Sequence, residues 1–362
     1  MAISTQRAST MGVLAVRFSS KSSHLIARLL LYLGTTVASI AALAANSVQP
    51  VTRVAEIRGV ARDVIDIRFS NDGKKIFARR DDGTSIIWEP SKSDGFQNVR
   101  CSTVIGDGDR CVSESDDVKV FELSTGKALY SLNTSGDVFV SPIGSYIAVA
   151  TATDGIVLFD GRQGSRIANL ASKWGFENVL FSENETVLAG SGAADFVVYD
   201  LKRRKVTKID VTDVRSFAIS KNGSLLWAAS GFAEPQVLAA TGKRASRNFP
   251  DGFSDRYSDS VFGRFMDADS KVVMRTILGK VGVWDWKSNA FAEIPTVAEK
   301  LATSEKGILT VTPARVMELW DRNIRKVVTF DGRMRLGAMT PDGTHISTVS
   351  FDGSLALWDV RP

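Results

Sequence analysis

The sequence predicts an all-β fold of many short strands joined by tight turns, and three observations indicate it. Glycine is frequent (29 residues) and proline scarce (9), while valine, isoleucine, phenylalanine and tryptophan dominate the apolar residues. Apolar and polar residues alternate along short segments, which is the periodicity of a half-buried strand. These segments recur at a regular spacing. The composition, 44% hydrophobic and 23% charged, is that of a soluble globular protein.

The repeating unit is clearest at the two ends of the repetitive region. From Val64 to Glu89 the chain alternates strand, Asn-Asp-Gly turn, strand, Asp-Asp-Gly turn and strand. The same order returns from Leu336 to Asp359, with Pro-Asp-Gly and Phe-Asp-Gly as the turns. The sequence therefore predicts copies of one antiparallel unit.

An aromatic residue followed by a carboxylate ends the third strand of nearly every copy. From the first to the last instance this mark recurs with a mean period of about 39 residues. In the fifth copy, Leu238-Ala239 holds the equivalent place without either feature. The seven instances are Trp88-Glu89, Phe121-Glu122, Phe159-Asp160, Tyr199-Asp200, Trp284-Asp285, Trp320-Asp321 and Trp358-Asp359.

These marks resemble the WD-repeat β-propellers, whose blades of four strands end the third strand in Trp-Asp. The resemblance implies that Trp88, Trp284, Trp320 and Trp358 are packing residues, buried between adjacent blades. The Gly-His that usually begins a repeat is absent, because the only histidine after the leader is His345, inside a second strand. The hydrogen-bonded tetrad of the family therefore cannot form in full, and we expect a divergent member.

The expected fold is a single propeller of about eight four-stranded blades, spanning residues 45–362. Eight blades require about 40 residues each, and an alternative of seven requires about 45. The last copy ends after three strands, and a strand-like segment, residues 50–57, precedes the first copy. Pairing this segment into the last blade would close the ring and remove an exposed sheet edge.

Residues 1–44 are predicted to be a targeting leader. They hold basic residues and no carboxylate, and an uncharged apolar run covers residues 29–45. Ala42-Leu43-Ala44 has the small residues of a signal-peptidase site with cleavage before Ala45, so the expected location is periplasmic or secreted. A mitochondrial presequence and an uncleaved membrane anchor are the alternatives.

Charged turns suggest where a partner could bind. The turns between third and fourth strands are rich in basic residues, above all Lys202, Arg203, Arg204 and Lys205, whereas those between second and third strands are mostly acidic. Because these turns lie on opposite faces of a propeller, the pattern predicts one basic and one acidic face. The alternative is that turns are simply polar and that Asp is common in Asp-Gly turns.

Residues 250–260 form the longest interruption between copies and are the best candidate for a partner contact. Phe253, Arg256 and Tyr257 are of types that dominate protein–protein contacts, and functional residues favour long loops on rigid scaffolds. A tolerated insertion is the alternative interpretation.

Cys101 and Cys111 flank the first hairpin of the second copy. In an oxidising compartment they could form a disulfide. Aligning Gly108 with Gly73 places them on opposite sides of the sheet, whereas a slip of one residue brings them to the same side. The sequence therefore leaves a bridge and two buried free thiols as alternatives.

The motifs favour a non-enzymatic scaffold for protein–protein interaction. There is no glycine-rich phosphate loop, Gly-x-Ser-x-Gly elbow or paired metal-binding motif, so we expect no enzyme activity, metal site or cofactor.

Five of the 45 basic residues precede the first acidic residue, Glu56, and the other 40 balance 40 acidic residues. A neutral body does not indicate nucleic-acid binding. We expect an unidentified protein partner, with membrane attachment if the leader is uncleaved. The alternative is a propeller enzyme with a central-channel site, either a calcium-dependent hydrolase or a quinone-linked dehydrogenase.

Overall fold

The computed structural model describes residues 51–361 except for 93–94, 107, 114–116, 152–153, 171–174, 193–194, 232 and 258. The predicted leader, residues 1–44, lies outside the described part of the chain. Within that part, no helix is both long enough and apolar enough to cross a membrane.

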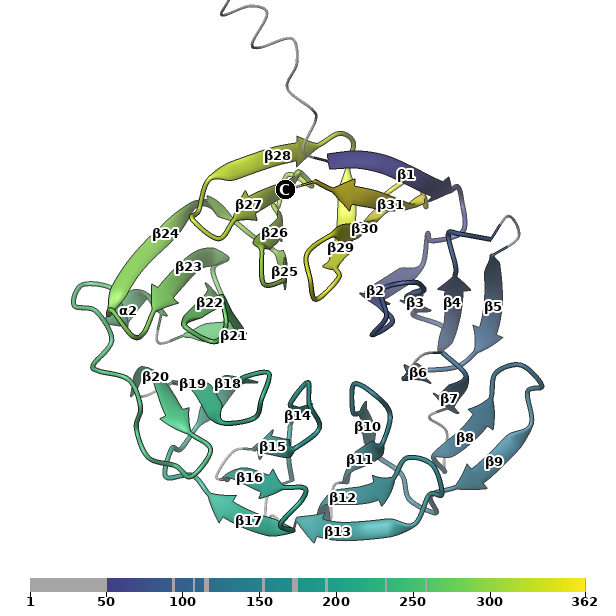
Figure 1. Cartoon of the computed structure of the whole chain (residues 1–362), viewed down its shortest axis with the longest axis horizontal. Coiled ribbons are helices and arrows are strands. Elements are labelled where there is room, and N and C mark those ends of the chain that lie inside the picture. Colours follow the sequence, from purple (N-terminus) through teal and green to yellow (C-terminus); the bar gives the residue numbers. More distant parts are fainter. Residues whose placement is uncertain are drawn as a thin grey trace, which may run out of the picture. The chain divides into compact units, whose positions relative to one another are not determined.

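Eight antiparallel sheets form a ring of blades, numbered here in chain order (Figure 1). In each blade the first strand lies nearest the centre of the ring and the last strand lies outermost. This confirms the predicted all-β propeller and its eight blades. The first four blades are β2 (Val64–Phe69), β3 (Ile76–Arg80), β4 (Thr84–Trp88) and β5 (Phe96–Arg100); β6 (Thr103–Ile105), β7 (Arg110–Ser113), β8 (Lys119–Glu122) and β9 (Ala128–Ser131); β10 (Asp137–Val140), β11 (Tyr146–Thr151), β12 (Gly155–Asp160) and β13 (Arg166–Leu170); and β14 (Asn178–Phe181), β15 (Val187–Ser191), β16 (Phe196–Asp200) and β17 (Lys205–Lys208).

The other four blades complete the ring. Blade 5 has only three strands, and a short helix, α2 (Ser254–Tyr257), follows it before blade 6. The strands are β18 (Val214–Ile219), β19 (Leu225–Ser230) and β20 (Ala233–Ala239); β21 (Ser260–Met266), β22 (Lys271–Thr276), β23 (Lys280–Asp285) and β24 (Ala290–Val297); β25 (Lys300–Thr303), β26 (Gly307–Val311), β27 (Met317–Asp321) and β28 (Lys326–Phe330); and β29 (Met334–Met339), β30 (His345–Ser350), β31 (Leu355–Val360) and β1 (Val51–Ile57).

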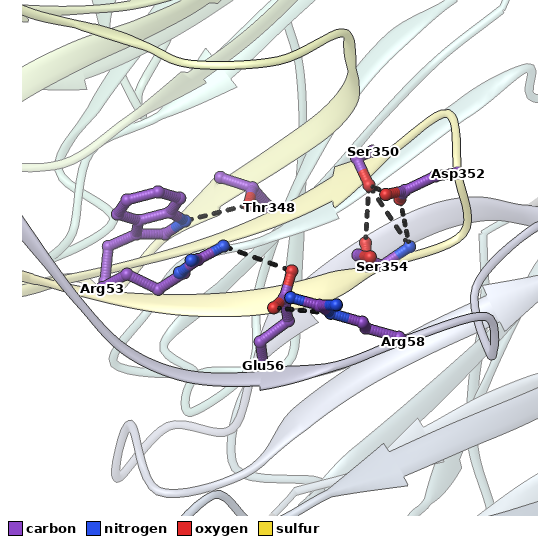
Figure 2. Close-up of polar contacts among 8 residues, drawn as sticks. Arg53, Glu56, Arg58, Thr348, Ser350, Asp352 and Ser354 are labelled. Atoms are coloured by element: carbon purple, nitrogen blue, oxygen red, sulfur yellow. Dashed lines mark hydrogen bonds and ion pairs between the residues drawn. The ribbon is translucent and has the colours of Figure 1, made fainter.

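The ring is closed by the N-terminal strand, as the sequence predicts. β1 pairs antiparallel with β31, from Val51 opposite Val360 to Ile57 opposite Leu355. On the outer side of this pair, Glu56 accepts hydrogen bonds from Arg53 (3.3 Å) and Arg58 (3.1 Å), as Figure 2 shows. The two ends of the propeller therefore share one sheet.

Blade 5 departs from the expected four strands. Its last segment forms an isolated bridge between Leu238 and Arg244 and a few backbone hydrogen bonds to β20, such as Ala239 N to Lys243 O at 2.7 Å and Ala245 N to Val237 O at 2.8 Å. Residues 243–248 are mostly basic or polar and lack alternating β-branched residues, so they do not continue the ladder. Blade 5 therefore has three regular strands with an irregular fourth segment beside β20, whereas the other seven sheets have the four predicted strands.

The hydrophobic core lies between neighbouring blades. In one cluster, Ile156 and Leu158 of blade 3 pack with Leu188 and Tyr199 of blade 4. Each sheet thus buries both faces against its two neighbours, which accounts for the nearly continuous apolar runs of the second and third strands.

Successive turns of each blade lie on opposite faces of the propeller, because its strands are antiparallel. We call face A the face with the turns between second and third strands and the connections between blades. Face B carries the turns between first and second and between third and fourth strands. This division follows from the antiparallel order of every sheet.

The four tryptophans of the aromatic–acid mark differ in burial. Trp88, Trp284 and Trp320 are buried, whereas Trp358 is half-buried. Trp320 packs with Val283 of the preceding blade. Trp358 lies next to the closing strand β1, where Arg53 stands 5.7 Å over its ring, so its burial between blades is incomplete.

We predict that Trp320→Ala lowers the free energy of unfolding by about 3–5 kcal/mol, because a fully buried ring leaves a cavity. Trp358→Ala is the matched comparison: each indole donates its Nε1 hydrogen to a threonine, Trp320 to Thr310 and Trp358 to Thr348, but only Trp320 is buried. Urea denaturation measures both. Equal losses for the two variants would contradict the burial argument.

Candidate functional site

The inner strands of the eight blades surround a central channel. Three connected cavities of about 400, 710 and 680 Å³ occupy it, and Arg264 lines all three. Large apolar side chains also reach the channel, among them Phe139 and Leu180, the latter 41% exposed. The channel wall is therefore partly apolar and partly charged.

An ion-pair network ties four blades together at the face B end of the channel. Lys221 contacts Glu305 at 2.8 Å and Glu183 at 3.8 Å, and Arg264 contacts Glu183 at 3.6 Å. Burial alone would lower the pKa of Lys221, but the hydrogen bond to Glu305 and the nearby carboxylates raise it above its ordinary value. These charges neutralise one another, so we interpret the network as a structural link between blades 4, 5, 6 and 7.

Buried hydroxyl groups fix the turns between first and second strands. Each accepts a hydrogen bond from the backbone N–H five residues later, at 2.9–3.0 Å in five blades. The sequence analysis missed these residues, although a Ser or Thr three residues before the glycine of each turn would have revealed most of them. They are Ser70, Ser141, Ser182, Ser220 and Thr340.

The carboxylate of the aromatic–acid mark caps the next turn. Asp200 Oδ1 accepts hydrogen bonds from Lys202 N (3.0 Å) and Arg203 N (2.8 Å). In their blades Asp160, Asp285 and Asp321 likewise accept from the backbone N–H two residues later. The backbone hydrogen bond from Arg203 lowers the pKa of Asp200 despite opposing desolvation. The repeated acid is thus a turn residue with a structural role.

This cap presents the basic residues predicted as a candidate contact. Lys202, Arg203, Arg204 and Lys205 are all exposed on face B, and Arg203 forms an ion pair with Asp200 at 3.1 Å. The hairpin between β16 and β17 holds their backbone in place. The structure therefore brings four cations together on one rigid turn.

The loop of residues 250–260 is anchored inward by aromatic rings. Tyr257 is fully buried, with its ring 4.9 Å from that of Phe291, and half-buried Phe253 lies 4.4 Å from the same ring. Of the three predicted contact residues, Arg256 alone is exposed, in an ion pair with Glu293 at 3.6 Å. The interpretation of Tyr257 as a partner contact is wrong, because its side chain belongs to the core of blades 5 and 6.

The structure joins Cys101 and Cys111 in a disulfide, with 5.8 Å between their Cα atoms. Val104 stands opposite Cys111, the register given by aligning Gly108 with Gly73. Cys101 lies before β6 begins, so its position does not follow the strand alternation that separated the two residues. Both sulfur-bearing residues are buried against Phe77 and Ile87 of blade 1.

The charge on face A changes around the ring. The blade 1 turn carries the exposed Asp81 and Asp82, as expected of an acidic face. Blades 7 and 8 add the half-buried Arg315 and the exposed Arg333, next to the exposed Asp331 and Asp352. Across the described residues, no group of three His, Cys, Asp or Glu side chains is placed to hold a metal ion.

Comparisons with solved structures show which fold this is. The C-terminal WD40 domain of Sif2 is 11% identical, with a TM-score of 0.64 over 86% of this chain and 99% of that one. A chain of a mitotic checkpoint complex is 15% identical, with a TM-score of 0.52 over 86% of this chain and 92% of that one. The fold is a WD40-type β-propeller. No family model matches the sequence, and no curated protein is similar to it.

The hydrogen bonds of the third-strand tryptophans differ from blade to blade, which shows that the repeat is divergent. Two blades keep the pair between the tryptophan and a second-strand hydroxyl, Trp320 with Thr310 (3.2 Å) and Trp358 with Thr348 (2.9 Å). In blade 6, Trp284 bonds to Asn289 of the following turn instead.

Acid should weaken the turn around Asp342. Desolvation opposes ionisation, but hydrogen bonds from Thr340 and Thr344 outweigh it and lower the pKa of Asp342 to about 2. A carboxyl whose folded pKa lies below its unfolded value, about 3.9, stabilises the fold fully above that value and progressively less as the pH falls toward the folded pKa. We therefore predict that Asp342→Ala lowers the melting temperature at neutral pH, by an amount that shrinks below about pH 4.

Melting curves of wild type and variant across this pH range measure the effect, with Asp251→Ala as an exposed carboxylate control. A difference between wild type and Asp342→Ala that stays constant down to about pH 3 would contradict the assignment.

Proposed function

We propose that this chain is a non-enzymatic scaffold that binds partner proteins through the turns of its propeller. The closed ring of eight sheets supports this, because it fixes the turns before a partner arrives and so limits the entropy lost on binding. One of the similar solved structures is, by its title, a complex. The expected partner is a protein and not a nucleic acid, since the basic and acidic residues balance from Glu56 to the end of the chain.

The observation that carries the proposal is the hairpin of Lys202–Lys205. Four successive exposed cations stand on a turn whose backbone is held by Asp200 and by the β16–β17 ladder. Structural stability does not need four cations there, since Asp200 bonds to the backbone and pairs with Arg203 alone. An acidic surface of a partner protein would complement them.

We predict position-dependent crosslinking in cells. A photoreactive amino acid in place of Arg203 on face B or Arg256 on face A should capture discrete partner proteins, whereas one in place of Phe96 on the outer strand β5 should not. Reversing Lys202–Lys205 to glutamate should then weaken the affinity of the purified partner captured at Arg203 by roughly tenfold. Isothermal titration calorimetry measures this. Equal capture at all three positions, or an unchanged affinity, would count against the scaffold.

We further propose that residues 1–44 export the protein and that the Cys101–Cys111 disulfide forms in the oxidising compartment that it reaches. The acid-free leader with Ala42-Leu43-Ala44 supports export, and a bridge across a sequence separation of 10 would stabilise the fold by about 2–3 kcal/mol. A mitochondrial presequence or a retained membrane anchor are the competing proposals.

For protein isolated from fractionated native cells, we predict a chain that starts at Ala45. After unfolding without reductant, neither cysteine should react with iodoacetamide, and both should react once the chain is reduced. Intact-mass spectrometry measures both features. A start before Ala45 would contradict cleavage at the proposed site, and labelling without reductant would contradict the disulfide.

The alternative, an enzyme with its site in the channel, rests on the size of the cavities. At about 680 and 710 Å³ the two larger ones lie within the range of small-ligand sites. Bound calcium or a quinone absorbance in protein from the native host would favour this alternative over the scaffold.

A further inference from the structure

Three arginines gather around one exposed aromatic ring on face A, where blades 7 and 8 meet. The guanidinium carbons of Arg315, Arg333 and Arg335 lie 5.4, 5.0 and 5.8 Å from the centroid of the Phe351 ring. Phe351 itself is 43% exposed. Arg315 and Phe351 come from the turns between second and third strands, Arg333 from the connection between the blades, and Arg335 from β29.

The positive charge of this cluster is only partly neutralised. Among the described residues, Arg315 is the one member with an ion pair, to Glu299. Arg335 donates its hydrogen bonds to the backbone carbonyls of Arg62 and Val64, which carry no net charge. All three cations surround one ring within about a Debye length of one another, so their mutual repulsion is not fully screened at physiological salt.

The backbone of Arg315 adopts a conformation that favours glycine. In blades 1, 6 and 8 the fourth residue of the equivalent turn is a glycine with positive φ, Gly83, Gly279 and Gly353, whose N–H bonds to the first residue of the turn. Arg315 occupies this place in blade 7 with φ of 66° and the same hydrogen bond, to Thr312 O. A residue with a Cβ is strained there, and glycine would not be.

We propose that Arg315, Arg333, Arg335 and Phe351 form a docking site for an acidic segment of a partner protein. This proposal rests on the scaffold function and names a second binding surface for it, on the face opposite Lys202–Lys205. Carboxylates of the segment would pair with the guanidinium groups and relieve their repulsion.

Two neighbours of the cluster favour a protein segment over a membrane surface. Asp331 and Asp352 are exposed in the same connections, so a uniformly anionic bilayer would meet like charges, whereas a segment of mixed sequence can avoid them. Ile277 and Leu278, 67% and 74% exposed, occupy the equivalent turn of blade 6, so face A also offers apolar side chains to a segment that extends from the cluster across blade 7. The leader is excluded as the occupant because it has no carboxylate.

Fluorescence anisotropy with a short labelled peptide of glutamates and aspartates that ends in two leucines tests the proposal on the purified propeller. We expect saturable binding that weakens with added salt, and a loss of roughly tenfold in affinity for Arg333→Glu. Arg315→Gly should also weaken binding while leaving the melting temperature unchanged or higher, because glycine relieves the strained backbone. Leu278→Ser should weaken binding but keep the salt dependence.

Phe96→Ala and Arg100→Glu are the matched controls, since both residues are exposed on the outer strand β5 of blade 1 and should leave peptide affinity unchanged. Four results would overturn the site: equal binding of a lysine peptide, wild-type affinity in Arg333→Glu, preferential binding to phosphatidylserine vesicles, or self-association that the arginine variants abolish. A lower melting temperature of Arg315→Gly with unchanged peptide affinity would assign Arg315 a purely structural role. Crosslinking at Arg203 that persists while the peptide fails would retain the scaffold and reject only this site.

Discussion

The backbone pairing of β1 with β31 is the interaction on which the rest of the structure depends. It joins residues 51–57 to the last strand of the chain, so that the ring closes and the outer edge of β31 is covered. Second contacts reinforce the same seam: Ala61 N donates to Gly353 O at 2.9 Å, and Arg335 reaches the carbonyls of Arg62 and Val64. The exposed pairs of Glu56 with Arg53 and Arg58 add little by comparison, since surface ion pairs are weak.

Closure also creates a surface that no single repeat contains. Arg62 precedes blade 1, whereas Arg335 and Phe351 belong to blade 8, yet they meet because the N-terminal strand brings the two blades together. The members of the basic cluster of face A come from blades 7 and 8, and closure adds the carbonyl groups of Arg62 and Val64 that hold Arg335. A truncated chain without β1 would lose the carbonyl partners of Arg335 along with the sheet.

The sequence predicted the repeat, the number of blades and the closing strand because each depends on local signals. Turn glycines, alternating apolar residues and the aromatic–acid mark all recur at one spacing, and the unpaired strand-like segment before Val64 has only one place to pair. It did not predict that the fourth segment of blade 5 would be irregular, because strand formation there depends on neighbours as well as on composition. Tyr257 was misread for a similar reason: an aromatic residue in a long loop can anchor the loop or contact a partner, and only the ring of Phe291 beside it decides.

Charge illustrates a further limit of the sequence. Assigning turns to faces by their class predicts a disc with one basic and one acidic side, and the turns of blade 1 with Asp81 and Asp82 agree. The connections between blades belong to the same face, however, and they bring Arg333 beside Arg315. Face A therefore mixes both signs of charge, with Asp81 and Asp82 at blade 1 and the three guanidinium groups beside Asp331 and Asp352 at blades 7 and 8. A charge difference between the two faces would select only the face that a partner approaches. An uneven distribution of charge within one face also sets the rotation at which the partner docks, because like charges repel each other in the other orientations.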